Sequence, residues 1–96
     1  MRSAAAALRT RASVFAALGD ETRLGLLGRL TDGEPPSISR LTAGTKLTRQ
    51  AVTKHLRVLE EARVVHAAKA GRESRLTFDP RPIVSAQAYL EHVTQQ

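Results

Sequence analysis

The sequence contains no cysteine and no tryptophan, and its only aromatic residues are two Phe and one Tyr. Without cysteine, the chain cannot form disulfides, bind metal through thiolates or sense redox changes through sulfur chemistry. No apolar run approaches the roughly 20 residues that a membrane-spanning helix needs, and we expect a cytoplasmic protein. With so few rings, the core of a single 96-residue domain must consist mainly of Leu, Val, Ile and Ala.

Positive charge exceeds negative charge by six at neutral pH, and the sequence pI is about 11.1. Most of the excess lies between residues 46 and 75, where eight Lys or Arg face three Glu, a net charge of +5. A basic segment in a small domain favours a polyanionic partner, most commonly nucleic acid. An anionic membrane surface and an ordinary solvated face are the alternatives.

The first thirty residues show two stretches of helical periodicity. The first predicts a helix over about 3–18, ended by Gly19, with apolar positions at Leu8, Ala12, Phe15 and Leu18. Asp20 is a suitable cap for a second helix, and the expected buried stripe of that helix is Leu24, Leu27 and Leu30. Gly25 and Gly28 each cost this helix about 1 kcal/mol relative to Ala. Either another helix approaches closely there or the cost is tolerated.

Two further helices follow a loop at 32–36 that contains Gly33 and a proline pair. Ser37 is placed to cap a short helix from 38 to about 43, and Thr48 to cap a longer one over about 49–62. A tight turn with Gly44 joins them. Two helices connected by a short turn containing Gly are the signature of a helix-turn-helix.

From residue 64 the pattern becomes that of strands, with segments 64–69 and 74–78 flanking a turn that contains Gly71. Pro80 and Pro82 end the second strand and open a last helix, whose apolar face is Ile83, Ala86, Leu90 and Val93. The predicted fold is mainly α with a small β-hairpin, a winged helix-turn-helix with four helices, two strands and a final helix. We expect residues 1–96 to form one domain, with the helix-turn-helix at about 37–62 and the wing at about 64–79.

The helix over about 49–62 divides cleanly on a helical wheel. One arc is apolar apart from His55, and the other is basic or amide-bearing in its first two turns and acidic at its end. Acids at a helix C-terminus oppose the helix dipole, so this order does not help the isolated helix. It suits a helix whose N-terminal half enters the major groove of DNA.

Side-chain chemistry predicts a role for each polar residue of this helix. Arg49 can donate two hydrogen bonds to guanine, and Gln50 can bond adenine in a bidentate manner. Lys54 and Arg57 suit phosphates, and arginines of the hairpin suit the backbone or the minor groove. The candidate DNA-contacting residues are Thr48, Arg49, Gln50, Thr53, Lys54, Arg57, Arg72 and Arg75. An amphipathic surface helix and a charged exposed hairpin without DNA contacts are the alternatives.

The three histidines do not indicate an active site. His55 lies within the apolar arc, which favours a structural residue hydrogen-bonded at its tip, while His66 falls in a strand and His92 near the C-terminus. No Ser/His/Asp order, Gly-rich phosphate loop or carboxylate pair accompanies them. We expect neither an enzyme nor a cofactor.

Three blocks of the sequence, at residues 15–27, 47–62 and 71–80, resemble the ArsR/SmtB-type winged-helix repressors, and the match extends over about 13–92. The resemblance implies a homodimer that binds a palindromic operator and usually represses transcription. It also implies a dimer interface formed by the first and last helices. A winged-helix protein-interaction module with little DNA binding, and a ligand- or metal-responsive repressor, remain as alternative functions.

Many members of this family sense metals, and here the sequence departs from their pattern. Residues 37–43 lack the family's cysteines. The family's other site, on paired last helices, is matched only by Asp79 before the helix and by Glu91 and His92 near its end. No His lies close to the start of that helix. Two carboxylates and one His are a weak basis for a zinc site, and no metal site is predicted.

Overall fold

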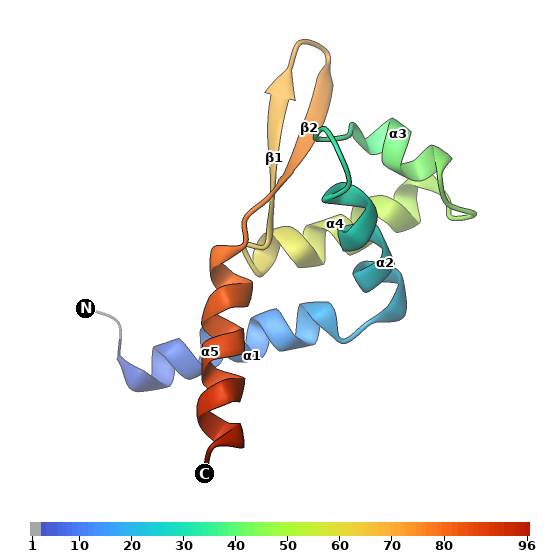
Figure 1. Ribbon diagram of the computed structural model, residues 1–96. Helices are drawn as coiled ribbons and strands as arrows, with labels where there is room; N and C mark the ends of the chain where they lie inside the picture. The colour runs from blue at the N-terminus through green and yellow to red at the C-terminus, as the bar shows by residue number, and fades with distance from the viewer. Residues whose placement is uncertain (1–2) are drawn as a thin grey trace.

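The computed structural model describes residues 3–96, and within them the chain forms five helices and one antiparallel hairpin (Figure 1). The elements are α1 (Ala4–Leu18), α2 (Glu21–Leu30), α3 (Ile38–Ala43), α4 (Arg49–Glu61), β1 (Val65–Ala70), β2 (Glu73–Phe78) and α5 (Arg81–Thr94). This confirms the predicted winged helix-turn-helix order. None of the helices within residues 3–96 is long and apolar enough to cross a membrane.

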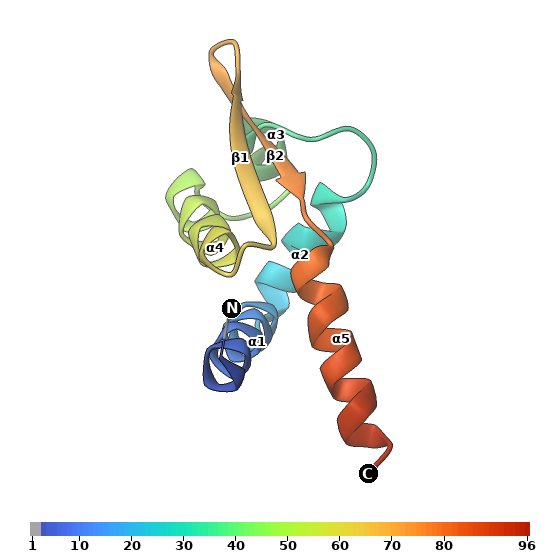
Figure 2. The same ribbon diagram turned by 90° about the vertical axis from the view of Figure 1, so that its left-hand side faces the viewer.

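The molecule is elongated, with extents of 45 × 28 × 23 Å. In both views the hairpin projects from one end and the C-terminal end of α5 from the other (Figures 1 and 2). Helices α1 and α5 pack against each other in the half away from the hairpin tip. There the Arg11 guanidinium of α1 lies 5.2 Å from the centroid of the Tyr89 ring of α5, close enough for a cation–π contact.

The core is aliphatic, as the shortage of rings requires. Helix α4 lies at its centre and contacts α1, α2, α3 and β1. The buried apolar side chains come from every element and are Val14, Ala17, Leu26, Leu30, Leu41, Val52, Leu56, Leu59, Ala62, Val64, Val65, Leu76 and Ala86.

Four of the helices begin at a side chain that satisfies one of their free backbone N–H groups. The side-chain oxygens of Ser3, Asp20, Ser37 and Thr48 accept hydrogen bonds of 2.9–3.1 Å from the N–H three residues ahead. Three of these caps were expected from the sequence. They fix where α2, α3 and α4 start.

The predicted stripe of α2 is wrong at one position. Leu30 is buried and Leu27 packs partly buried against the core, as expected, but Leu24 is 53% exposed and Leu26 is buried in its place. Residues 26 and 30, four apart, lie more nearly on one face of a helix than residues 24 and 30 do. Neither glycine of α2 marks a close helix contact. A Cβ built at Gly25 or Gly28 meets nothing within 4 Å, so their cost is simply tolerated.

The backbone conformation of Arg63 and one backbone hydrogen bond determine the direction in which the chain leaves α4 and enters the hairpin. Arg63 adopts φ +63° at the end of α4, and the N–H of Val64 donates to the carbonyl of Leu59 at 3.1 Å, which reverses the chain as glycine commonly does. The hairpin then pairs Val65 with Phe78 through Ala70 with Glu73, leaving a two-residue turn at 71–72.

The loop before α3 also contacts the hairpin, through strand β2. The N–H of Leu76 donates to the carbonyl of Pro36 at 3.0 Å, and Ser37 forms an isolated bridge with Arg75. The middle of β2 is therefore attached to the start of the helix-turn-helix.

Asp79 organises the junction between β2 and α5. Its carboxylate accepts hydrogen bonds from Arg81 Nε at 3.0 Å and Nη2 at 2.7 Å, and His66 Nε2 lies 3.4 Å away. Its N–H donates to the Val64 carbonyl at 2.8 Å. The Arg81 hydrogen bonds hold the pKa of Asp79 well below its usual range, because they favour the charged carboxylate.

The open surface at the α2 glycines predicts a gain in stability on substitution. Gly25→Ala and Gly28→Ala should each raise the free energy of unfolding by about 1 kcal/mol, because Ala restricts the unfolded chain and favours helix. Urea unfolding followed by circular dichroism measures this. Gly71→Ala is the matched control and should be destabilising, because Gly71 has φ +67°. A lower urea midpoint for Gly25→Ala than for the wild type would contradict the finding that a Cβ at this position meets no neighbouring atom.

The Asp79 junction predicts a pH-dependent contribution to stability. A carboxyl group whose pKa is lowered by folding stabilises the fold above its unfolded pKa, and this contribution is lost as the pH falls. Asp79→Asn should lower the thermal midpoint at pH 7, and the deficit should shrink between about pH 4 and pH 2. The exposed Asp32→Asn is the control and should change little at either pH. An equal deficit at pH 7 and pH 2 would contradict a stabilising role of the charged Asp79 carboxylate.

Candidate nucleic-acid interface

The orientation of α4 follows from which of its faces is buried. Val52, Leu56 and Leu59 have at most 2% of their surface exposed. Since these residues repeat at helical spacing, the opposite face must point outward. That outward face carries Arg49, Gln50, Thr53, Lys54 and Arg57, which together line one shallow surface hollow.

The charge of this hollow is not neutralised from within. Three of its five lining residues are cationic and none is acidic. Within residues 3–96, no ion pair or hydrogen bond engages the head groups of Lys54 and Arg57. The face therefore presents free cations, which attract a polyanion.

Within residues 3–96, Arg49 is the one cation of this face with a protein partner, since its Nη1 donates to Ser39 Oγ of α3 at 3.0 Å. The guanidinium group retains further N–H donors after this bond. The bond places Arg49 at the junction of the two helices of the helix-turn-helix.

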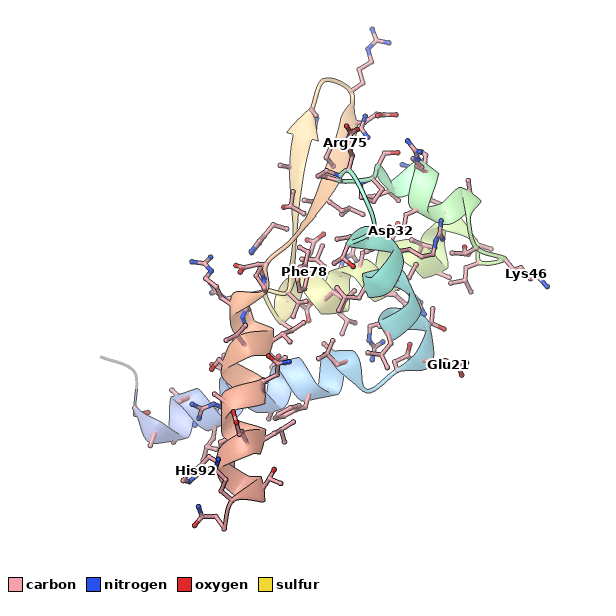
Figure 3. All side chains as sticks on the ribbon, viewed as in Figure 1. Glu21, Asp32, Lys46, Arg75, Phe78 and His92 are labelled. Carbon is pink, nitrogen blue, oxygen red and sulfur yellow. The ribbon has the colours of Figure 1, made fainter. Side chains whose placement is uncertain are left out.

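The turn between α3 and α4 is fixed by short-range hydrogen bonds. Thr45 donates both its N–H and its hydroxyl to the Thr42 carbonyl at 2.9 Å, and Thr45 Oγ1 accepts from the Leu47 N–H at 3.1 Å. Lys46 projects from this turn away from the body of the molecule (Figure 3). Sequence reasoning did not single out Lys46 or the exposed Arg40 of α3, although both are basic residues of the helix-turn-helix.

His55 is structural, as its place in the apolar arc predicts. Its Nδ1 lies 3.3 Å from Arg23 Nη1 and 3.9 Å from the Asp20 carboxylate. Since the guanidinium group can only donate, Arg23 is the donor in its contact with His55. Arg23 also donates through Nε to the Ala17 carbonyl at 2.6 Å. Its backbone N–H lowers the pKa of Asp20 by bonding the charged carboxylate.

This cluster joins three elements at one point. Ala17 belongs to α1, Asp20 and Arg23 to the start of α2, and His55 to α4. The buried side of the polar α4 helix is thereby held in register by directional bonds as well as by apolar packing.

The two wing arginines lie in different surroundings. Arg72 occupies the exposed two-residue turn at the hairpin tip. Arg75 lies nearer α3 (Figure 3), where its guanidinium pairs with Glu73 at 3.1 Å and donates to the Pro35 carbonyl at 3.3 Å. Arg72 thus projects outward, whereas Arg75 connects the wing to the loop.

The residues considered for a metal site do not gather. Asp79 is engaged by Arg81 and His66 before α5 begins, whereas Glu91 and His92 lie in its last turns. Within residues 3–96 no group of three or more His, Asp or Glu side chains could hold a metal ion.

Comparison with known proteins agrees with this geometry. Residues 18–66 match the family model of the helix-turn-helix domain. The chain is 35% identical over 77 residues to the uncharacterized HTH-type transcriptional regulator YuzN of Bacillus subtilis (strain 168), covering 74% of this chain and 84% of that protein.

Solved structures extend the similarity to the whole fold. An ArsR-like transcriptional regulator from Rhodococcus sp. RHA1 is 35% identical, with a TM-score of 0.82 over 92% of this chain and 82% of that one. The antimony-specific transcriptional repressor AntR is 26% identical, with a TM-score of 0.67 over 98% of this chain and 87% of that one. The chain therefore belongs to the ArsR-like winged helix-turn-helix transcriptional regulators.

Proposed function

We propose that this regulator is a homodimeric repressor that binds a palindromic operator, with α4 in the major groove and the wing on the adjacent backbone or minor groove. The observation that carries the proposal is the outward face of α4, where three cations face solvent without an acid among them. In helix-turn-helix docking, the N-terminal part of the second helix reaches the base edges.

The side chains of this face divide by the contacts their chemistry allows. Arg49, Gln50 and Thr53 lie in the first two turns and suit base edges. Lys54 and Arg57, which have no hydrogen-bond or ion-pair partner among the described residues, suit phosphates, and Arg72 suits the backbone or minor groove beyond the hairpin tip. Thr48 caps the start of α4 and in this proposal lies beside the major groove that the helix enters. Arg75 supports the wing against the loop in this proposal, so its effect on DNA is indirect.

The proposed dimer interface uses α1 and α5. Large apolar side chains remain exposed on both helices, namely Leu8, Val84, Leu90 and Val93. Burying such side chains against a second copy would remove apolar surface from water, and a two-fold axis would give two α4 helices that read symmetric half-sites.

Repression is inferred from the family, and AntR is named as a repressor. Its antimony specificity is not proposed for this chain. Soft metal ions prefer thiolate ligands, and this chain has no cysteine.

The division of roles on α4 predicts two different mutant phenotypes. With an operator first obtained by selection from random duplexes, Arg49→Ala should reduce the preference for the operator over a scrambled duplex. Lys54→Ala should weaken both duplexes alike and reduce the slope of log K against log salt by about one. Fluorescence anisotropy across a salt series measures both, with Arg9→Ala on α1 as the basic control. Equal loss of preference in both variants would contradict the division.

The proposed interface predicts a loss of dimerisation without a loss of folding. Leu90→Glu should shift the sedimenting species from twice 10.4 kDa to 10.4 kDa, because a charge cannot be buried there without a partner. Leu24→Glu on α2, at a similarly exposed leucine, is the matched control and should stay dimeric. A wild-type chain that sediments as a monomer at micromolar concentration would refute the dimer.

A further inference from the structure

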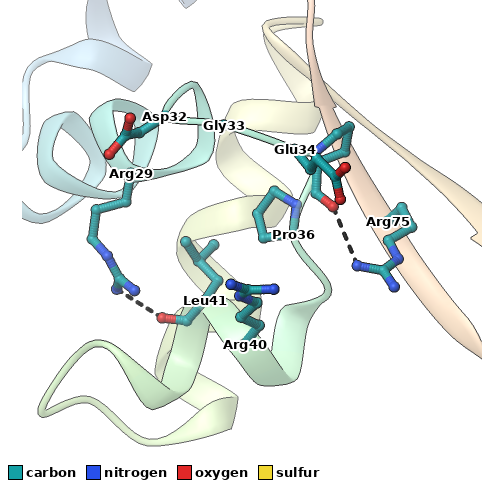
Figure 4. A pocket seen from close by; sticks show the side chains of 9 residues that line it. Arg29, Asp32, Gly33, Glu34, Pro36, Arg40, Leu41 and Arg75 are labelled. Carbon is teal, nitrogen blue, oxygen red and sulfur yellow. Dashed lines mark hydrogen bonds between the residues drawn. The ribbon is translucent and has the colours of Figure 1, made fainter.

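A polar cavity of about 400 Å³ lies where the helix-turn-helix meets the wing (Figure 4). Its walls come from the end of α2, the loop at 32–36, the second half of α3 and the middle of β2. The volume falls within the ~300–1,000 Å³ range of small-molecule sites. None of the eight candidate DNA-contacting residues except Arg75 lines it.

Three arginines from three different elements line this cavity, and backbone carbonyls hold two of them in place. Arg29 of α2 donates through Nη1 to the Leu41 carbonyl at 2.8 Å, and Arg75 of β2 donates to the Pro35 carbonyl at 3.3 Å. In the view of Figure 4, Arg40 of α3 lies between them. A neutral carbonyl orients a guanidinium without cancelling its charge, so Arg29 is positioned in advance for an anion, while Arg75 is oriented by the Pro35 carbonyl and also paired with Glu73.

The remaining charges of the cavity make no ion pairs with these arginines. Within residues 3–96, no side-chain hydrogen bond or salt bridge engages the guanidinium of Arg40 or the carboxylates of Asp32 and Glu34. Among the three arginines, Arg75 is paired with an acid of the described chain, Glu73, which does not line the cavity. The lining therefore has three cations and two anions, with Arg40 free to bond a ligand.

We propose that this cavity binds a small organic anion through a carboxylate or phosphate group held by Arg40, Arg75 and Arg29. Bidentate bonding between a guanidinium and such a group is among the strongest hydrogen bonds in proteins. A DNA phosphate has the same chemistry, but a duplex brings many charges close to Asp32 and Glu34, which repel them. A single small anion avoids this repulsion.

An occupant would touch the helix-turn-helix through Arg40 and the wing through Arg75. It would therefore link the two parts of the proposed DNA-contacting surface. The binding itself does not depend on the proposed operator recognition, so it is tested without DNA, and its failure leaves operator recognition untouched.

The test uses ¹⁵N-labelled full-length protein titrated separately with inorganic phosphate and with citrate, at constant ionic strength. Saturable shifts of the amide signals of Gly33, Glu34, Arg40, Leu41 and Arg75 are expected for at least one probe. Arg40→Gln should weaken that binding about tenfold, as for the loss of a hydrogen bond between charged groups. Glu34→Gln should strengthen it about threefold by removing a repulsive charge.

Two variants outside the cavity are the matched controls. Arg72→Gln changes the net charge as Arg40→Gln does, and Glu60→Gln changes it as Glu34→Gln does. They should leave the affinity unchanged. The proposal is overturned if neither probe binds, if Arg72→Gln weakens binding as much as Arg40→Gln does, or if the shifts centre on residues 49–57. It is also overturned if a short duplex shifts the cavity signals while phosphate and citrate do not, because the cavity would then be a backbone contact.

Discussion

The burial of one face of α4 is the constraint on which the rest of the structure depends. Val52, Leu56 and Leu59 anchor a helix that contacts α1, α2, α3 and β1, so the other elements are arranged around it. The same burial determines which side chains remain outside. A helix has only one opposite face, and here that face is cationic in its first turns. The packing of α4 thus also determines which proposed DNA-contacting residues face outward. The contact between Arg23 and His55 adds a directional interaction that fixes the rotation of the helix.

Much of this arrangement could be predicted because its signals are local. Caps at Asp20, Ser37 and Thr48, the Gly-containing turn before α4, and the change of period after residue 62 each act within a few residues. The structural role of His55 was also visible, since a polar residue within an apolar arc must find a partner. Which partner it finds was not visible, because Arg23 lies 32 residues away in sequence.

The features that escaped prediction depend on contacts distant in sequence or on exact helical phase. The link from Arg75 to Pro35 spans 40 residues, and nothing in the local pattern of the hairpin indicates it. The cavity beside it escaped for the same reason, since its walls come from four separate segments. Leu24 was misplaced because α2 has only ten residues, so several stripes fit its leucines nearly equally well.

The contact between Arg11 and Tyr89 has a consequence for spectroscopy. The chain has no Trp and a single Tyr, so its intrinsic ultraviolet fluorescence comes essentially from one ring. That ring lies on α5 against a side chain of α1. Its emission therefore follows the packing of these two helices, while α4 has no Phe, Tyr or Trp and the hairpin has only the weakly emitting Phe78. An unlabelled fluorescence trace will report the α1–α5 half of the molecule, and a dye at the hairpin would be needed to observe the other half.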